Sequence, residues 1–245
     1  MRCNQRFFGQ EHFERGTAGR DFCSKLNVLR PVMGQYGFAV DDRVPSILSD
    51  VGGLVQVKYN GMLSVVMWDD KRGGFAAWGP RGRCYYSLPH GRKHPVTEYF
   101  NQHVTEFKDL VFVGETYVVQ KVGGKSYMTE FNKSMSIIKN PRSTSEVNRI
   151  RLAVFDYARK RDDGEYDRIM SNDKYIERFA QLSKGFGLPV GCDSNVVHLP
   201  DCLEIEGSFQ DAHGDVQKFW DEFIGKRGFE GLVVHTNSGG DYKIK

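Results

Sequence analysis

The chain has 245 residues, a formal net charge of +3 and 27% charged residues, which is ordinary for a globular protein. Hydrophobic residues make up 40% of the sequence, which is enough for a core and excludes a disordered or collagen-like chain. No apolar run is long enough to span a bilayer, and the N-terminal residues lack the apolar segment of a signal peptide. We therefore expect a soluble, intracellular, cytoplasmic protein that has no contact with a membrane.

The cysteine and histidine spacings do not indicate a metal site. The five cysteines are odd in number and contain no CxxC pair, so they fit neither a disulfide framework nor a zinc site. His90 and His94 have HxxxH spacing, but Pro89 and Pro95 flank them and disfavour a helix that would carry both on one face.

In chain order, residues 1–50 are interpreted as an N-terminal lead-in that packs on the core, with a short helix or strand over 24–32. From residue 51 the pattern becomes regular. The expected strands are 54–57, 63–68, 75–78, 111–119, 151–157, 232–234 and 242–245. The expected helices are 96–110, 172–182 and 216–224.

Short β-branched strands interleaved with a few helices predict an α+β domain with antiparallel sheets. We expect this domain to cover residues 51–245. Because the sequence ends inside an expected strand, a C-terminal domain is expected to be absent or truncated.

Charged residues interrupt the apolar strands at a few positions. Lys58 opens a KYNG segment at a corner between two expected strands, which alone is an ordinary turn with a surface lysine. Glu115 lies inside an apolar strand, and Glu230 directly precedes another. Lys243 and Lys245 alternate along the last strand, so their side chains point to the same face.

Each of these charges has an ordinary explanation by itself. A salt bridge would account for either carboxylate, and a solvated strand edge would account for either C-terminal lysine. Burying charged groups is costly unless they pair or bind a ligand. Together, the lysines and glutamates are better explained if their charges offset one another around a metal–nucleotide complex.

The order of these segments resembles that of the covalent nucleotidyltransferase superfamily, which contains DNA ligases, RNA ligases and mRNA capping enzymes. The matching segments are KYNG (58–61), VGETY (113–117), LAVFDY (152–157), FEGLVV (229–234) and YKIK (242–245). The resemblance implies a nucleotidyltransferase (adenylation) domain, with antiparallel β-sheets flanked by helices around a central nucleotide cleft.

The resemblance also implies roles in catalysis. Lys58 would attack the α-phosphate of ATP and form a lysyl–AMP intermediate, after losing its proton with the help of nearby cations. Lys243 and Lys245 would neutralise the α-phosphate in the transition state. Glu230 would position Mg²⁺ or Mn²⁺, and Glu115 would contact the ribose or orient metal-bound water.

The implied nucleotide contacts extend beyond the charged residues. Phe155 is similar to the aromatic residue that stacks on the purine, and Val57 would offer only its backbone carbonyl. Arg81 matches a basic position of the family loosely; Arg83 could take that place, or both could belong to a plain basic turn. The implied nucleotide-binding residues are Val57, Lys58, Gly61, Arg81, Glu115, Phe155, Lys243 and Lys245.

Within the superfamily, the sequence favours an RNA ligase that acts on RNA ends, with DNA as a possible substrate. DNA ligases commonly carry Arg at the position of Leu63 and a longer insert than residues 235–241, and no OB-fold domain is recognisable after the last motif. Asn60 replaces the usual acid of the first motif. The alternatives are an ATP-dependent DNA ligase, a GTP-dependent capping enzyme and a catalytically silent module that binds nucleic-acid ends.

Overall fold

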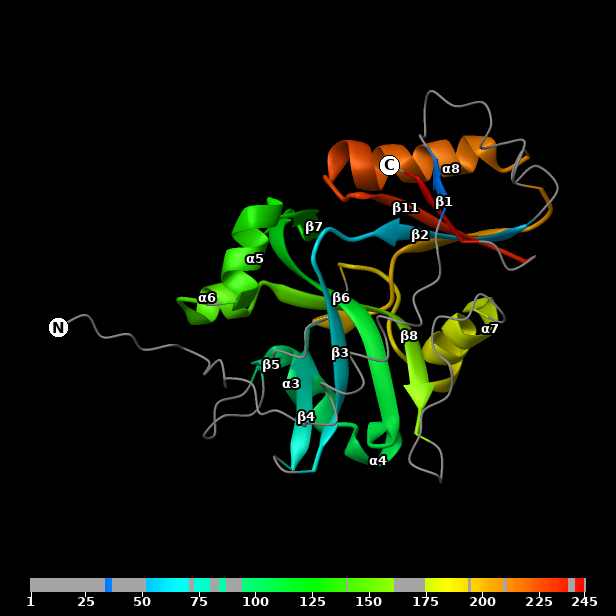
Figure 1. Cartoon of the computed structure of the whole chain (residues 1–245). Helices are drawn as coiled ribbons and strands as arrows, with labels where there is room; N and C mark the ends of the chain where they lie inside the picture. The colour runs from blue at the N-terminus through cyan, green and yellow to red at the C-terminus, as the bar shows by residue number, and fades with distance from the viewer. Residues whose placement is uncertain are drawn as a thin grey trace.

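The computed structural model describes residues 34–36, 52–70, 73–79, 84–86, 94–139, 141–160, 175–193, 195–208, 211–237 and 241–244. These residues form two β-sheets with helices packed around them (Figure 1). The α+β class expected from the sequence is therefore confirmed.

Sheet A has the strand order β1-β12-β11-β2-β10 within the described residues. Its strands are β1 (Gly34–Tyr36), β12 (Asp241–Ile244), β11 (Gly231–Thr236), β2 (Gly53–Lys58) and β10 (Cys202–Ile205). All neighbouring strands are antiparallel except β1 and β12, which pair in parallel.

Sheet B has the order β5-β4-β3-β6-β8-β9, and β7 also pairs with β6. Its strands are β5 (Cys84–Tyr86), β4 (Gly74–Trp78), β3 (Met62–Asp69), β6 (Leu110–Val122), β8 (Ile150–Arg159), β9 (Val197–His198) and β7 (Lys125–Met128). Like the pairing of β1 with β12, the pairing of β8 with β9 is parallel, an exception within the expected antiparallel sheets. Strand β6 lies between β3 and β8 and is buried along most of its length, which explains its long apolar run.

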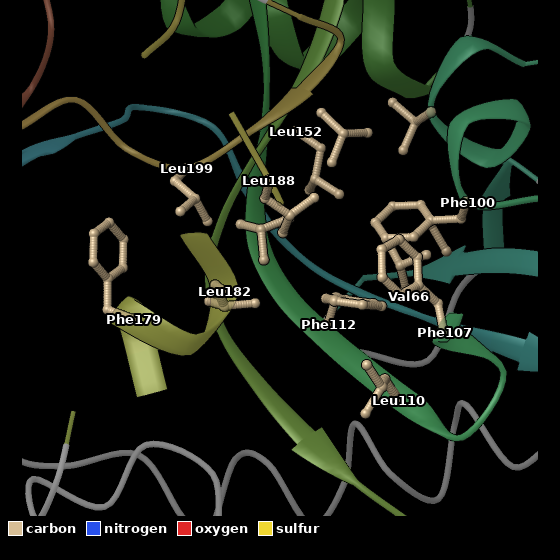
Figure 2. Packing of buried hydrophobic residues seen from close by; sticks show 14 of the residues in the cluster. Val66, Phe100, Phe107, Leu110, Phe112, Leu152, Phe179, Leu182, Leu188 and Leu199 are labelled. Carbon is tan, nitrogen blue, oxygen red and sulfur yellow. The ribbon is translucent and has the colours of Figure 1, made fainter. Parts of the chain in front are cut away.

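The largest buried cluster lies on one face of sheet B. In Figure 2, Phe112 of β6 is close to Phe100 and Phe107, and Leu182, Leu188 and Leu199 lie nearby. A second cluster joins sheet A to α8 (His213–Trp220) through Val216, Val57 and Leu232, so α8 covers one face of sheet A (Figure 1).

The prediction of one continuous helix over 96–110 was wrong. The chain forms α3 (Pro95–Asn101) and α4 (Val104–Phe107), and Leu110 already begins β6. The Asn101 side-chain oxygen accepts a hydrogen bond from the Phe75 backbone N–H at 3.0 Å. Asn is a poor residue for a helix interior, and this bond engages its side chain where the first helix ends.

The other two expected helices exist with different ends. Helix α7 (Tyr175–Ala180) continues into a wider π-type turn over Gln181–Gly185, and α8 continues into a similar turn over Asp221–Lys226. Residues 172–174 and 24–32 lie outside the described residues. Helices α5 (Phe131–Lys139) and α6 (Thr144–Val147) were not expected from the sequence. None of the helices in the described ranges is both long and apolar enough to cross a bilayer.

Candidate active site

Lys58 is the last residue of β2. After it, the chain leaves sheet A and enters β3 of sheet B, as the labelled strands in Figure 1 show. The ammonium group of Lys58 contacts the carboxylate of Glu230, and each side chain is 20% exposed. The backbone N–H of Glu230 donates to the carbonyl of Lys58 at 3.0 Å, and Gly231 pairs with Lys58 across β11 and β2. The antiparallel register of two strands therefore holds this lysine and this carboxylate together.

Glu115 borders the same loop from sheet B. One of its carboxylate oxygens accepts a hydrogen bond from the backbone N–H of Gly61 at 3.1 Å. A Cβ atom on Gly61 would lie 2.2 Å from the carbonyl oxygen of Thr116, a separation that real Cβ atoms do not show. Glycine at this position permits the close approach that forms the Glu115 bond.

Lys243 lies on the same face of sheet A as Lys58. Gln56 is two residues before Lys58 in β2, so both side chains point to one face. Val233 pairs with Gln56 on one side and with Lys243 on the other, and paired residues share a face. Two predicted site residues, Lys245 and Arg81, lie outside the described residues, as does Arg83.

Phe155 lies in β8, at a bulge where the pairing shifts from Val113 with Asp156 to Gly114 with Val154. Bulges redirect side chains and are frequent beside active sites. Phe155 is partly buried among side chains of sheet B.

Tyr175 of α7 connects Phe155 to sheet A. Its hydroxyl lies 2.8 Å from the carbonyl oxygen of Phe155 and 2.9 Å from the Oε1 atom of Gln56. The Tyr175 ring stacks on His235 of β11 with 3.8 Å between ring centroids. Phe155 is thereby joined to the face of sheet A that carries Lys58.

The Val57 side chain is 2% exposed and packs in the cluster beneath α8. It points to the opposite face from Lys58, as strand alternation requires. The Val57 side chain is therefore not available to a ligand, and the contact of its backbone carbonyl with the nucleotide stays a prediction.

Beneath the Lys58 loop lies a buried polar cluster that the sequence interpretation missed. The Tyr59 hydroxyl donates to Oδ2 of Asp201 at 3.0 Å, and the N–H of Cys192 donates to the same oxygen at 2.9 Å. Burial raises the pKa of Tyr59 well above its usual range, so its hydroxyl stays protonated. Tyr59 and Asp201 are 142 residues apart, and no local pattern in the sequence indicates their contact.

His198 and Tyr117 form a second pair in the same cluster. The Nδ1 atom of His198 lies 2.7 Å from the carbonyl of Leu199, which can only accept, so Nδ1 carries the proton. Its Nε2 atom then accepts from the Tyr117 hydroxyl at 2.7 Å. Burial lowers the pKa of His198 to about 4, so the ring is neutral at pH 7.

The donor atoms around the loop suit a divalent cation held jointly with phosphates. Glu115 and Glu230 offer carboxylate oxygens, which hard cations such as Mg²⁺ prefer. The part of the chain that the structure describes contains no group of three or more His, Cys, Asp or Glu residues able to hold a metal ion. Magnesium at phosphate-transfer sites commonly uses only one or two carboxylates together with phosphates and water, and the donor set here fits that type.

Comparison with known proteins places the fold. No protein-family model matches the chain, and no curated protein matches it. Among solved structures, a protein from Aquifex aeolicus described as an ATP-dependent DNA ligase gives a TM-score of 0.51 at 14% identity, over 87% of this chain and 48% of that chain.

Two further solved structures are an archaeal ATP-dependent RNA ligase and the bacteriophage T7 ATP-dependent DNA ligase in complex with ATP. The archaeal protein gives a TM-score of 0.48 at 16% identity, over 87% of this chain and 47% of that chain. The phage protein gives 0.45 at 11% identity, over 87% of this chain and 68% of that chain. The chain spans about half the length of the Aquifex and archaeal proteins.

Sequence identities this low establish the fold only. The arrangement of two sheets with helices packed around them is consistent with this likeness. The chain therefore has the nucleotidyltransferase fold of the ATP-dependent polynucleotide ligases.

Proposed function

We propose that the chain is the adenylation domain of an ATP-dependent RNA ligase that forms a covalent lysyl–AMP intermediate at Lys58. The observation that carries this proposal is the convergence of four charged residues. Lys58 contacts Glu230, Glu115 binds the same loop, and Lys243 lies on the same sheet face as Lys58.

The first chemical step requires an amine positioned for in-line attack on the α-phosphorus of ATP. The Nζ atom of Lys58 forms a P–N bond, the bond from the α-phosphorus to the bridging oxygen breaks, and pyrophosphate leaves. The amine attacks in its neutral form, and the proton that its nitrogen loses as the P–N bond forms passes to solvent. Glu230 orients the Lys58 side chain before the nucleotide arrives, and Lys243 supplies positive charge for the phosphate oxygens.

Glu115 and Glu230 would hold Mg²⁺ or Mn²⁺ together with the ATP phosphates, and the bound cation would neutralise phosphate charge. In the later steps, AMP would pass from Lys58 to a 5′-phosphate end, and the 3′-hydroxyl of a second end would then displace AMP. Phe155 would stack on the purine. Arg81 and Lys245, which the family motifs also indicate, would add positive charge at the same nucleotide.

The proposal is tested by labelling with α-³²P-ATP or α-³²P-GTP in the presence of Mg²⁺ or Mn²⁺, followed by denaturation. We expect label from ATP to remain on the wild-type protein and none to remain on Lys58→Ala. Lys125 is a suitable control because it also forms an ion pair with a glutamate, Glu222, at 2.7 Å, at a more exposed position elsewhere in the protein. Lys125→Ala should be labelled like the wild type.

If neither nucleotide labels the protein, the proposed enzymatic activity is refuted and a silent module that binds nucleic-acid ends is favoured. Label from GTP alone would indicate a capping-type guanylyltransferase. For substrate class, we would compare joining of matched RNA and DNA strands that carry 5′-phosphates. If the protein joins only nicks in DNA, the proposal of an RNA ligase gives way to that of a DNA ligase.

A further inference from the structure

Two chain segments cross from one sheet to the other beside Lys58. Residues 59–61 lead from β2 in sheet A to β3 in sheet B, and residues 199–201 lead from β9 in sheet B to β10 in sheet A. Strand β10 pairs with β2, so the ends of both crossovers lie next to each other. Asp201 is the last residue of the second crossover.

Asp201 contacts both residues that flank Lys58. Its carbonyl accepts from the backbone N–H of Val57 at 2.9 Å, and its carboxylate accepts from the Tyr59 hydroxyl at 3.0 Å. The N–H of Asp201 also donates to the Tyr59 hydroxyl oxygen at 3.3 Å. Cys192 holds the carboxylate from the other side, through its N–H at 2.9 Å.

The Tyr59 ring is fixed by packing as well as by its hydroxyl. It is 4% exposed and lies 4.6 Å from the Tyr117 ring and 5.2 Å from the Phe229 ring, between centroids. Phe229 immediately precedes Glu230, the residue that contacts the Lys58 ammonium. The backbone on both sides of Lys58 is therefore held in place by the contacts that Asp201 and the buried Tyr59 ring make.

We propose that Asp201, acting through Tyr59, is a positioning residue for the Lys58 amine. The inference rests on the proposed function, because it concerns the geometry of the same nucleophile. Asp201 does not touch the nucleotide or the reacting atoms in this role. It holds the end of β2 so that the lysine side chain leaves the strand toward Glu230.

A displacement of about 1 Å at a reacting group can lower a rate about a hundredfold. Loss of the Tyr59–Asp201 bond should therefore slow lysyl–AMP formation at saturating ATP. ATP affinity should change little, because the proposed function assigns no nucleotide contact to either residue. A purely structural role would lower stability without this selective effect on rate.

The chain offers a matched pair of variants. Tyr59→Phe and Tyr117→Phe each remove one buried hydroxyl that donates one hydrogen bond, from rings that pack against each other. Only Tyr59 adjoins Lys58. We would measure the single-turnover rate of Lys58 labelling, the ATP concentration for half-maximal rate, and the melting temperature.

We expect Tyr59→Phe to slow labelling at least about tenfold, with unchanged half-maximal ATP, whereas Tyr117→Phe should lower the melting temperature without a comparable loss of rate. Asp201→Ala should act like Tyr59→Phe. Asp201→Asn should restore most of the rate, because both donated bonds reach a single carboxylate oxygen that an amide oxygen can replace. Should Asp201→Ala fail to fold, Tyr59→Phe still decides the question, because it keeps the ring packing.

Equal slowing by Tyr59→Phe and Tyr117→Phe would overturn the positioning role, as would wild-type rates in Tyr59→Phe. In both cases the wild type is labelled and the proposed function stands. Absence of label on the wild type would instead remove the proposed function, and the positioning role with it.

Discussion

Gly61→Ala is the substitution for which the structure gives the most direct prediction. A Cβ atom at this position would lie 2.2 Å from the carbonyl oxygen of Thr116 and 3.0 Å from Cγ of Glu115. Both neighbours belong to β6, which is paired on both sides and cannot move away easily. The loop must shift, and the 3.1 Å bond from the Gly61 N–H to Glu115 is the contact that would be lost.

Overpacking of this kind costs about 1–3 kcal/mol of unfolding free energy. In a protein of this size each kcal/mol corresponds to about 2–4 °C in melting temperature. The shift of the loop also moves Lys58, three residues earlier, away from Glu230. We therefore expect the rate of Lys58 adenylation to fall about a hundredfold, well beyond the effect on stability.

The assay pairs thermal melting with labelling by α-³²P-ATP at a temperature where both proteins are folded. Gly214→Ala is the control, because nothing lies within 4 Å of the Cβ position in this helical residue. Alanine there should be neutral or stabilise the protein by up to about 1 kcal/mol, without an effect on labelling. Wild-type labelling in Gly61→Ala would refute the argument that this glycine sets the loop geometry.

Three further predictions concern stability and charge. Asp156→Ala should cost about 3–5 kcal/mol in urea unfolding, because it leaves Arg178, which reaches both carboxylate oxygens at 2.8 and 3.1 Å, without its buried partner; a loss below about 1 kcal/mol would contradict this. Burial lowers the pKa of His198 to about 4 and that of His94 to about 3, whereas unfolded histidine titrates near 6.5. The unfolded state therefore binds protons more readily than the folded state. Protonation linked to His198 should lower the free energy of unfolding by about 3 kcal/mol as the pH falls from about 6.5 to about 4, and His198→Gln should reduce this pH dependence. Lys243→Ala should lower the labelling rate about a hundredfold with little change in melting temperature, and an unchanged rate would exclude Lys243 from phosphate binding.

Much of the secondary structure could be predicted because its signals are local. The expected strands over 63–68, 111–119 and 151–157 were confirmed within longer observed strands, because a run of buried β-branched residues is itself a signal for a strand. Helix α5 was not predicted. Its sequence, FNKSMSIIK, has a Ser at the buried position 134, and a hydroxyl there does not give the apolar periodicity of a helix.

The pairing of strands could not be predicted, because it depends on contacts far apart in the sequence. The alternation of residues in β12 indicates that Lys243 has a defined face, but not that β11 lies between it and β2. The charged residues Lys58, Glu115 and Glu230 were identified because a charge inside an apolar strand is unusual. Tyr59 and Asp201 have no such signal, since a tyrosine in a turn and an aspartate after a proline are ordinary on a surface.

Three hydrogen bonds fix the backbone around Lys58 at successive points. The N–H of Val57 binds Asp201 at 2.9 Å, the carbonyl of Lys58 binds the N–H of Glu230 at 3.0 Å, and the N–H of Gly61 binds a β6 carboxylate at 3.1 Å. Because contacts with both sheets hold the main chain, only the lysine side chain would have to move. In the proposed reaction it would leave the Glu230 carboxylate for a phosphate of the nucleotide. An amine that turns from a carboxylate to a phosphate needs little reorganisation, and groups arranged before the substrate binds are the main source of electrostatic catalysis. The partners come from different strands and crossovers, so the proposed nucleophile is positioned by the fold as a whole rather than by its own motif.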